Sequence, residues 1–278
     1  MNKIIVFQTD FGLDDGAISA MEGVSYQVSY DLNIRHLTHN IPQYNIFDAS
    51  YRLYQAIDYW PEETTFVSVV DPGVGSDRKS IVAKTKTNMY VVTPDNGTLT
   101  HIEKHIGIEE VREIEEKSNR LKDSELSYTF HGRDVYAYTA ARLASETITF
   151  EEVGPKINVE DIVKLELYGC QKIENGISGY IDILDVRFGS LWTSIPYKDF
   201  VDCGFKIGDD ILVEIYHNDR RVYSNRINYG KSFADVEINE PIIYMNSVYD
   251  MALAINQGDF SKAYGIGVGK QWKITMTK

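Results

Sequence analysis

Three short apolar segments near the N-terminus each end at a turn that contains an aspartate and a glycine. They are Ile4–Phe7 before Asp10, Phe66–Val70 before Asp71, and Tyr90–Val92 before Asp95. Apolar, β-branched runs of this length predict buried strands. If the strands belong to one parallel sheet, their carboxylates gather at its carboxyl edge, where open α/β sheets bind ligands. The pattern therefore predicts a binding site at that edge.

Segments with apolar residues at helical spacing alternate with these strands in the first half of the chain. The helical patterns cover residues 16–30, 45–59 and 131–144. Alternation of this kind predicts a βαβ sheet with helices on both faces. We therefore expect residues 1–160 to form an α/β domain.

The second half of the chain has a different periodicity. Apolar and polar residues alternate over residues 178–184, 210–216, 221–226 and 272–276, with Gly, Asn and Asp turns between them. This pattern favours a smaller, antiparallel, β-barrel-like domain over residues 175–278. The boundary is expected within residues 151–174. The predicted fold class is thus α/β, with an N-terminal βαβ sheet domain and a C-terminal β domain.

The net charge and the composition limit the kinds of partner that the protein is expected to bind. The 278-residue chain has a net charge of −13, which argues against nucleic acid or an anionic membrane as a partner. No apolar run approaches the roughly 20 residues that span a bilayer, and no signal-peptide pattern opens the chain, so we expect a cytoplasmic protein. The two cysteines, Cys170 and Cys203, lack metal-site spacing and are expected to stay reduced.

Metal and cofactor motifs are weak in this sequence. His101 and His105 are four residues apart with Glu103 between them, but no third ligand stands at a recognisable spacing. We interpret them as a solvated helical face. No dinucleotide fingerprint, phosphate loop or serine nucleophile elbow is present. We expect neither a metal ion nor a cofactor.

Several short motifs occur in the order found in one family. They are Thr9-Asp10-Phe11-Gly12 with Asp15, Val70–Gly75 with Arg78, Pro94-Asp95-Asn96-Gly97, Phe130-His131-Gly132-Arg133-Asp134, Asp185 with Phe188-Gly189, and Asn246-Ser247. With these motifs the chain resembles the S-adenosyl-L-methionine (SAM) hydroxide adenosyltransferases, hydrolases related to the bacterial fluorinase and chlorinase. The resemblance covers nearly the whole chain.

The resemblance implies displacement at the ribose 5′ carbon, in which water replaces methionine and the products are adenosine and L-methionine. The matching catalytic positions are Asp71, Arg78 and His131, which would hold the water in line with the carbon–sulfur bond. Which of them acts as the base stays open. Taken singly, each has a structural explanation: Asp71 opens a Pro-Gly turn, Arg78 pairs with any carboxylate, and His131 caps a helix.

The family pattern also implies a set of substrate-binding residues. They are Asp10, Asp15, Asn96, Asp185, Phe188, Ser190, Tyr244 and Ser247. Asp10 would bind the ribose hydroxyls, with Asn96 near the same nucleoside, and the carboxylates of Asp15 and Asp185 would face the cationic methionine part. Ser190 stands where the family usually has an asparagine that reads the adenine edge, which puts adenine selectivity in doubt.

The resemblance also implies an assembly, and three alternative functions stay open beside it. Relatives form trimers with the site between the α/β domain of one subunit and the β domain of its neighbour, so a homotrimer is expected. The catalytic trio favours water over a halide, although a halogenase-type adenosyltransferase stays open. A non-catalytic adenosine or SAM sensor is another alternative. The Asp-rich segment around Asp10 also resembles the calcium loop of nucleoside hydrolases, but Gln8 replaces one of its carboxylates.

Overall fold

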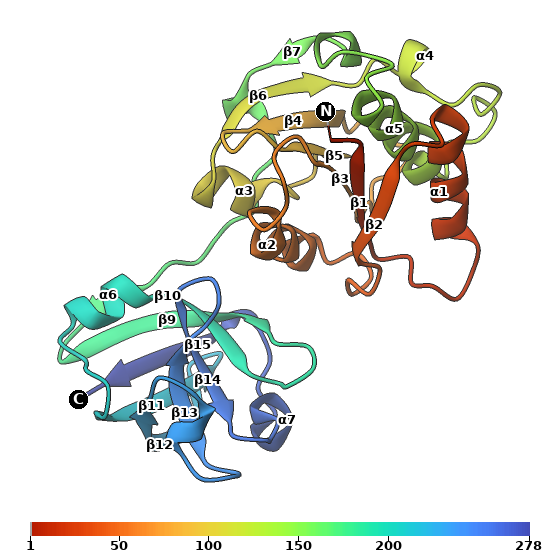
Figure 1. The fold of residues 1–278 in the computed structure, drawn as a ribbon. Coiled ribbons are helices and arrows are strands. Elements are labelled where there is room, and N and C mark those ends of the chain that lie inside the picture. The colour runs from red at the N-terminus through yellow and green to blue at the C-terminus, as the bar shows by residue number, and fades with distance from the viewer. Residues whose placement is uncertain (1) are drawn as a thin grey trace. The chain divides into compact units, whose positions relative to one another are not determined.

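The computed structural model describes residues 2–278 and divides into two compact units, one ending at Leu165 and the other spanning Glu166–Lys278. The N-terminal unit is built on a seven-stranded sheet with the order β2-β1-β3-β5-β4-β6-β7 (Figure 1). Its strands are β1 (Ile4–Thr9), β2 (Asn33–Thr38), β3 (Thr65–Val69), β4 (Ser80–Thr85), β5 (Tyr90–Pro94), β6 (Ile108–Glu113) and β7 (Lys156–Ile157).

The three strands predicted from the apolar runs are neighbours in this sheet. β1 pairs in parallel with β3, and β3 pairs in parallel with β5. The carboxyl ends of these strands therefore lie at one edge, as the sequence predicts. The sheet is mixed rather than purely parallel, because β4 runs antiparallel to both β5 and β6.

Helices cover both faces of the sheet, which confirms the predicted architecture. The helices of this unit are α1 (Ala17–Val28), α2 (Ile46–Ile57), α3 (Thr100–His105), α4 (Glu116–Asn119), the π-helix η1 (Gly132–Ala137), α5 (Tyr138–Ala144), and the 3₁₀ turns η2 (Glu151–Val153) and η3 (Val159–Asp161). One core joins α1, η1 and α5 to strand residues such as Phe7 and Val69. A second core joins α2 and α3 to the opposite face, through residues such as Val6 and Phe66.

The C-terminal unit is a closed sheet with its own core. Its elements are β8 (Gln171–Ile173), β9 (Gly176–Leu184), β10 (Leu191–Pro196), α6 (Tyr197–Asp202), β11 (Asp210–His217), β12 (Arg220–Tyr229), η4 (Phe233–Asp235), β13 (Pro241–Met245), β14 (Asp250–Ile255), α7 (Phe260–Tyr264) and β15 (Gly269–Thr277). The order is β10-β14-β13-β12-β11-β15-β9-β8, and pairing of β10 with β9 closes seven strands into a barrel. All pairs are antiparallel except β12 with β13. The expected β domain is confirmed.

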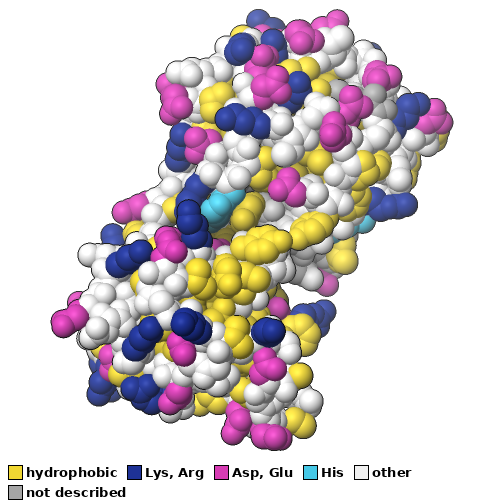
Figure 2. Space-filling model, turned by 60° about the vertical axis from the view of Figure 1, so that its left-hand side comes forward, with side chains coloured by type: hydrophobic (Ala, Val, Ile, Leu, Met, Phe, Trp, Pro, Cys, Tyr) yellow, Lys and Arg dark blue, Asp and Glu magenta, His cyan; other side chains and the backbone are white. Residues whose placement is uncertain are grey.

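The surface charges, the two cysteines and the helix lengths bear on the expectations about partners and location. On the face shown in Figure 2, acidic and basic side chains are interspersed, so the acidic excess does not gather into one patch there. Both Cys170 and Cys203 are free thiols. Among residues 2–278, no helix combines the length and apolar character needed to cross a bilayer.

Candidate active site

Three of the predicted carboxylates share a pocket at the carboxyl ends of β1 and β3. Asp10 and Asp71 line a cavity of about 570 Å³ together with Asp15, which lies just before α1. The Asp10 carboxylate accepts a hydrogen bond of 2.9 Å from the backbone N–H of Tyr44. Asp15 accepts one of 2.8 Å from the backbone N–H of Ala17, in the first turn of α1. Both carboxylates keep further acceptor capacity toward the cavity.

The turn after β5 does not deliver its polar side chains to this pocket. The Asn96 amide donates to the carbonyl oxygen of Val70 at 2.8 Å, and its oxygen accepts from the hydroxyl of Thr98, also at 2.8 Å. Asp95 accepts from the backbone N–H of Val163, and burial raises the pKa of its carboxyl. In the described chain Asn96 therefore supports the segment that leads to Asp71.

Asp71, Arg78 and His131 meet in one buried cluster, although His131 is 53 residues beyond Arg78 in the sequence. Nε of Arg78 donates to Asp71 Oδ1 at 2.8 Å, and Nη2 donates to Oδ2, so the pair is bidentate. The same Nη2 lies 3.2 Å from Nδ1 of His131. The Asp71 and Arg78 side chains are 5% and 11% exposed. A charge-assisted, two-point contact of this kind fixes both groups in position.

The contact with Arg78 determines where neutral His131 carries its proton. A guanidinium can only donate, so Nδ1 accepts and Nε2 carries the hydrogen. Burial lowers the pKa of His131, with Arg78 and Arg120 adding to that effect and Glu116 and Asp71 opposing it. Nε2 is buried and has no hydrogen-bond partner among residues 2–278. The cluster thus presents one unused N–H donor.

Two residues that the sequence analysis did not single out extend the cluster. Arg78 Nη1 donates to Ser80 Oγ at 3.0 Å, and that hydroxyl lies 3.2 Å from the hydroxyl of Tyr136. The guanidinium also lies over the Tyr136 ring, 5.6 Å from its centroid. Tyr136 is fully buried, and burial raises the pKa of its hydroxyl. Its place one turn after His131 was the available signal, but an aromatic residue in an apolar helix usually indicates core.

The remaining predicted residues line one pocket in the C-terminal unit. This pocket has a volume of about 1060 Å³ and its lining includes Asp185, Phe188, Ser190, Tyr244 and Ser247. Burial raises the pKa of the Tyr244 hydroxyl, while hydrogen bonds with Ser190 and Trp192 oppose that shift. The Phe188 ring is 68% exposed, whereas Ser190 is buried. The structure therefore brings the predicted residues together as two separate sets, one in each unit.

Asn246 is a further lining residue that the sequence analysis left without a role. Its side-chain oxygen accepts from the backbone N–H groups of Val248 and Asp250, both at 3.0 Å. Its amide nitrogen is buried and finds no partner within the described chain. A buried donor of this kind is costly to leave unsatisfied, so it marks a place where a ligand oxygen would be favourable.

The predicted solvated face is wrong for His101, whereas His105 stacks on Tyr54 but stays exposed. His101 is 3% exposed, lies 2.8 Å from Ser50 Oγ through Nδ1, and stacks near Tyr54 of α2. Burial lowers the pKa of His101 to about 3 and that of His105 to about 4. His101 packs α3 on α2, because aromatic side chains of α2 surround its ring. Among residues 2–278, no three His, Cys, Asp or Glu side chains are grouped as metal ligands.

Comparison with known proteins assigns the chain to a family. The SAM hydroxide adenosyltransferase N-terminal domain matches residues 5–154, and the corresponding C-terminal domain matches residues 179–273. The chain belongs to the SAM hydroxide adenosyltransferase family. These two matches lie in the two units of the chain and confirm the resemblance predicted from the motifs.

Individual relatives agree with that assignment. A protein named (R)-S-adenosyl-L-methionine hydrolase from Methanocaldococcus jannaschii is 35% identical over 249 residues, covering 88% of this chain and 85% of the relative. A fluorinase from Actinopolyspora mzabensis is 23% identical over 98% of this chain and 97% of its own. The structure of an uncharacterized conserved protein from Thermotoga maritima matches with a TM-score of 0.87 and 31% identity, covering 99% of this chain and 100% of that chain.

Proposed function

We propose that this protein hydrolyses S-adenosyl-L-methionine to adenosine and L-methionine. The observation that carries the proposal is the cluster of Asp71, Arg78 and His131, in which a buried Nε2–H has no partner among residues 2–278. Its support comes from relatives named (R)-S-adenosyl-L-methionine hydrolase at 28–35% identity. Those names also motivate the choice of the R epimer at sulfur as the preferred substrate.

The reaction proceeds by attack of a water oxygen on the ribose 5′ carbon. The new bond joins that oxygen to the carbon, while the carbon–sulfur bond breaks and its electron pair stays on the sulfur of methionine. The sulfonium becomes a neutral thioether and one proton is released. A leaving group that is already cationic requires neither acid nor metal assistance, so the reaction uses no cofactor.

The cluster would act by positioning and polarising that water. His131 donates from Nε2 to the water oxygen, and the Asp71 carboxylate accepts one of the water's hydrogens. Arg78 holds Asp71 and His131 in register. The water is thereby fixed before attack, which lowers the entropic part of the activation barrier of a bimolecular displacement.

Substrate binding would draw on both pockets. We propose that Asp10 binds the ribose hydroxyls and Asp15 faces the methionine part, while the C-terminal pocket binds the remainder of the substrate. As in the family pattern, the complete site would form in a homotrimer between neighbouring subunits. Ser190 would contact adenine with a single hydroxyl instead of the paired contacts of an amide.

Incubation with SAM of known epimer content, with and without chloride, tests the proposal. Chromatography should show adenosine and methionine in equal amounts and no 5′-chloro-5′-deoxyadenosine. The Asp71→Asn variant should lose turnover by about 10²-fold or more while retaining most of its affinity, because it removes an interaction with the attacking water.

Other outcomes would identify the alternatives. Formation of the chloro product would favour a halogenating adenosyltransferase, as the fluorinase relatives motivate. Tight SAM binding without any product would favour a sensor. In that case Asp71→Asn would change only the affinity for SAM. Calorimetric titration of both proteins with SAM measures the affinity on which this comparison depends.

A further inference from the structure

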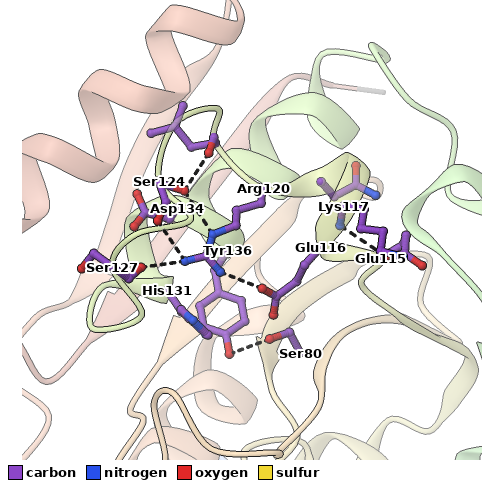
Figure 3. A network of polar contacts seen from close by, with 12 residues as sticks. Ser80, Glu115, Glu116, Lys117, Arg120, Ser124, Ser127, His131, Asp134 and Tyr136 are labelled. Atoms are coloured by element: carbon purple, nitrogen blue, oxygen red, sulfur yellow. Dashed lines mark hydrogen bonds and ion pairs between the residues drawn. The ribbon is translucent and has the colours of Figure 1, made fainter.

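The segment that leads into His131 is organised around one buried arginine. Arg120 follows α4, and its side chain is only 6% exposed. Figure 3 shows its guanidinium pointing toward Glu116, Ser124 and Ser127. It donates to Glu116 Oε2 at 2.7 Å, to Ser124 Oγ at 3.1 Å and to the carbonyl oxygen of Ser127 at 2.8 Å. One side chain therefore fastens the loop to α4 at several points.

The loop also contacts the Asp71–Arg78 turn and His131, which are the two parts of the catalytic cluster. The Arg120 guanidinium lies over the Tyr128 ring, 4.8 Å from its centroid, and that ring makes an edge contact with His131 at 6.3 Å. The carbonyl oxygen of Tyr128 also lies so close to Gly75 that a Cβ there would come within 3.2 Å. Gly75 belongs to the turn between Asp71 and Arg78. The loop thus touches the Asp71–Arg78 turn and His131 together.

The far side of the loop is fixed to the helix that follows His131. The backbone N–H of Leu121 donates to the carbonyl oxygen of Asp134 in η1, at 2.8 Å. The Ser124 hydroxyl donates to the carbonyl oxygen of Leu121 at 2.6 Å. The loop between Leu121 and His131 is therefore anchored at Leu121 by the backbone contact and at Ser124 and Ser127 by Arg120.

The charges of Glu116 and Arg120 also affect the pKa of His131. Among the groups that act on its imidazole, burial has the largest effect and lowers its pKa, Glu116 raises it, and Arg120 lowers it. The other contributing charges are Arg78 and Asp71, from the turn after β3. Glu116 and Arg120 form an ion pair, and their effects on the pKa of His131 oppose each other.

We propose that Arg120 is a positioning residue for the reaction: its buried guanidinium clamps residues 121–130 so that His131 Nε2 keeps its place relative to Asp71. This inference rests on the proposed hydrolase function. Arg120 does not touch the attacking water in this scheme and acts through the loop and through His131.

The Arg120→Lys variant tests the clamp, since lysine keeps the charge but loses the planar fork of donors. We expect kcat to fall about 10- to 100-fold, as for a catalytic group displaced by up to 1 Å, with KM within about twofold. Amide exchange over residues 121–131 should become at least about tenfold faster. Glu116→Gln, which removes the ion pair and the carboxylate charge that acts on His131, but leaves the contacts of Arg120 with the loop, should produce smaller changes in loop exchange.

Arg142→Lys is the matched control. Arg142 also uses its guanidinium on α4, donating to Asn119 Oδ1 at 2.7 Å, and lies over the Tyr138 ring at 5.5 Å, but it contacts neither the 121–130 loop nor His131. This control should leave kcat and exchange in the loop unchanged. In a His131→Gln background, Arg120→Lys should cause no further loss of kcat, since both act through one group.

Distinct results separate failure of the clamp from failure of the proposed function. Equal kcat and equal loop exchange for Arg120→Lys and Arg142→Lys would overturn the clamp in an active hydrolase. Additive losses with His131→Gln would show that Arg120 supports the fold generally. Absence of SAM turnover in the unaltered protein would overturn the hydrolase function and the kinetic role, and unchanged exchange would remove the structural role too.

Discussion

Arg78 shows how one side chain can set the chemistry of its neighbours. Its N–H groups are divided among the Asp71 carboxylate, the His131 ring and the Ser80 hydroxyl. Because all of them are donors, Asp71 is held as an acceptor and His131 as the Nε2–H tautomer. Lysine could supply the charge at this position but not the planar, three-partner geometry.

Gly132, the residue after His131, lies where the turn that carries Asp10 packs against the π-helix η1. A Cβ on this glycine would lie 3.2 Å from the Phe11 ring and 3.3 Å from the Phe130 ring, closer than ordinary contact. Both rings line the pocket that holds Asp10. The absence of a side chain at Gly132 therefore allows Phe11 to pack directly against the residue after His131.

We predict that Gly132→Ala raises KM for SAM severalfold, because Phe11 must shift where it borders the pocket. Gly23→Ala is the matched control, since Gly23 lies inside α1 with open space around its Cβ position. That control should stabilise the protein by about 0.5–1 kcal/mol, whereas Gly132→Ala should cost about 1 kcal/mol or more through overpacking. Urea unfolding and steady-state kinetics measure both effects, and identical behaviour of the two variants would contradict the prediction.

At the scale of elements, packing of α3 on α2 depends on a neutral histidine. His101 is buried among aromatic rings of α2 and bonded to Ser50. Burial lowers its pKa to about 3 from a value near 6.5 in the unfolded chain. Between these two pH values the unfolded state binds a proton that the native state excludes, so stability falls as the pH is lowered through this range.

We predict that His101→Gln flattens the acid side of the stability profile. One histidine of this kind contributes a slope of up to about 1.4 kcal/mol per pH unit between pH 6.5 and about pH 3. Glutamine can keep a hydrogen bond to Ser50 but does not titrate. Urea unfolding at a series of pH values compares it with His217→Gln, the loss of a half-exposed imidazole in the other unit. Parallel profiles for the unaltered protein and His101→Gln would refute the prediction.

Sequence periodicity was sufficient for the elements whose apolar faces are regular. The runs that became β1, β3 and β5, and the helical pattern of α2, were recognisable because each buries a continuous face. β4 was not predicted, although it is buried and forms a short-looped hairpin with β5. The His101 contact was also missed, since a polar ring loses its exposure only through the aromatic partners that the fold brings to it.

The candidate site divides in the same way. The trio was predictable through motif order, and the structure brings those three side chains together. Ser80, Tyr136 and Arg120 were not predicted, because their roles arise from contacts with Arg78 and with the loop before His131. Asn96 is present in the motif, yet its side chain is used on the backbone of Val70 and on Thr98.

For the whole molecule, the main feature is the distribution of the predicted substrate contacts over two units. Each unit has its own hydrophobic core and its own pocket. Asp10, Asp15 and Asp71 line one pocket, while Asp185 and the adenine and amino-acid candidates line the other. Under the proposed homotrimer, a working site combines a pocket from one subunit with a pocket from the next.

We predict that two inactive variants complement each other. Asp71→Asn affects the first pocket and Asp185→Asn the second, so mixed trimers should contain some sites with neither change. Random mixing at equal amounts should restore about a quarter of the unaltered activity, because each contributing face is intact half of the time. Sedimentation should give three times the mass of one chain. Recovery of no activity from verified mixed trimers would show that each site lies within a single chain.

The edge strands of the two sheets affect the tendency of the protein to aggregate at high concentration. The outermost strands of the N-terminal sheet are β2, with exposed Arg35 and His36, and β7, which has only two residues. The barrel in the other unit is closed apart from the short, exposed strand β8, which carries Lys172. Charged or very short outer strands are poor templates for recruiting a strand from another molecule. Such strand ends disfavour conversion into cross-β aggregates even when many copies are crowded together.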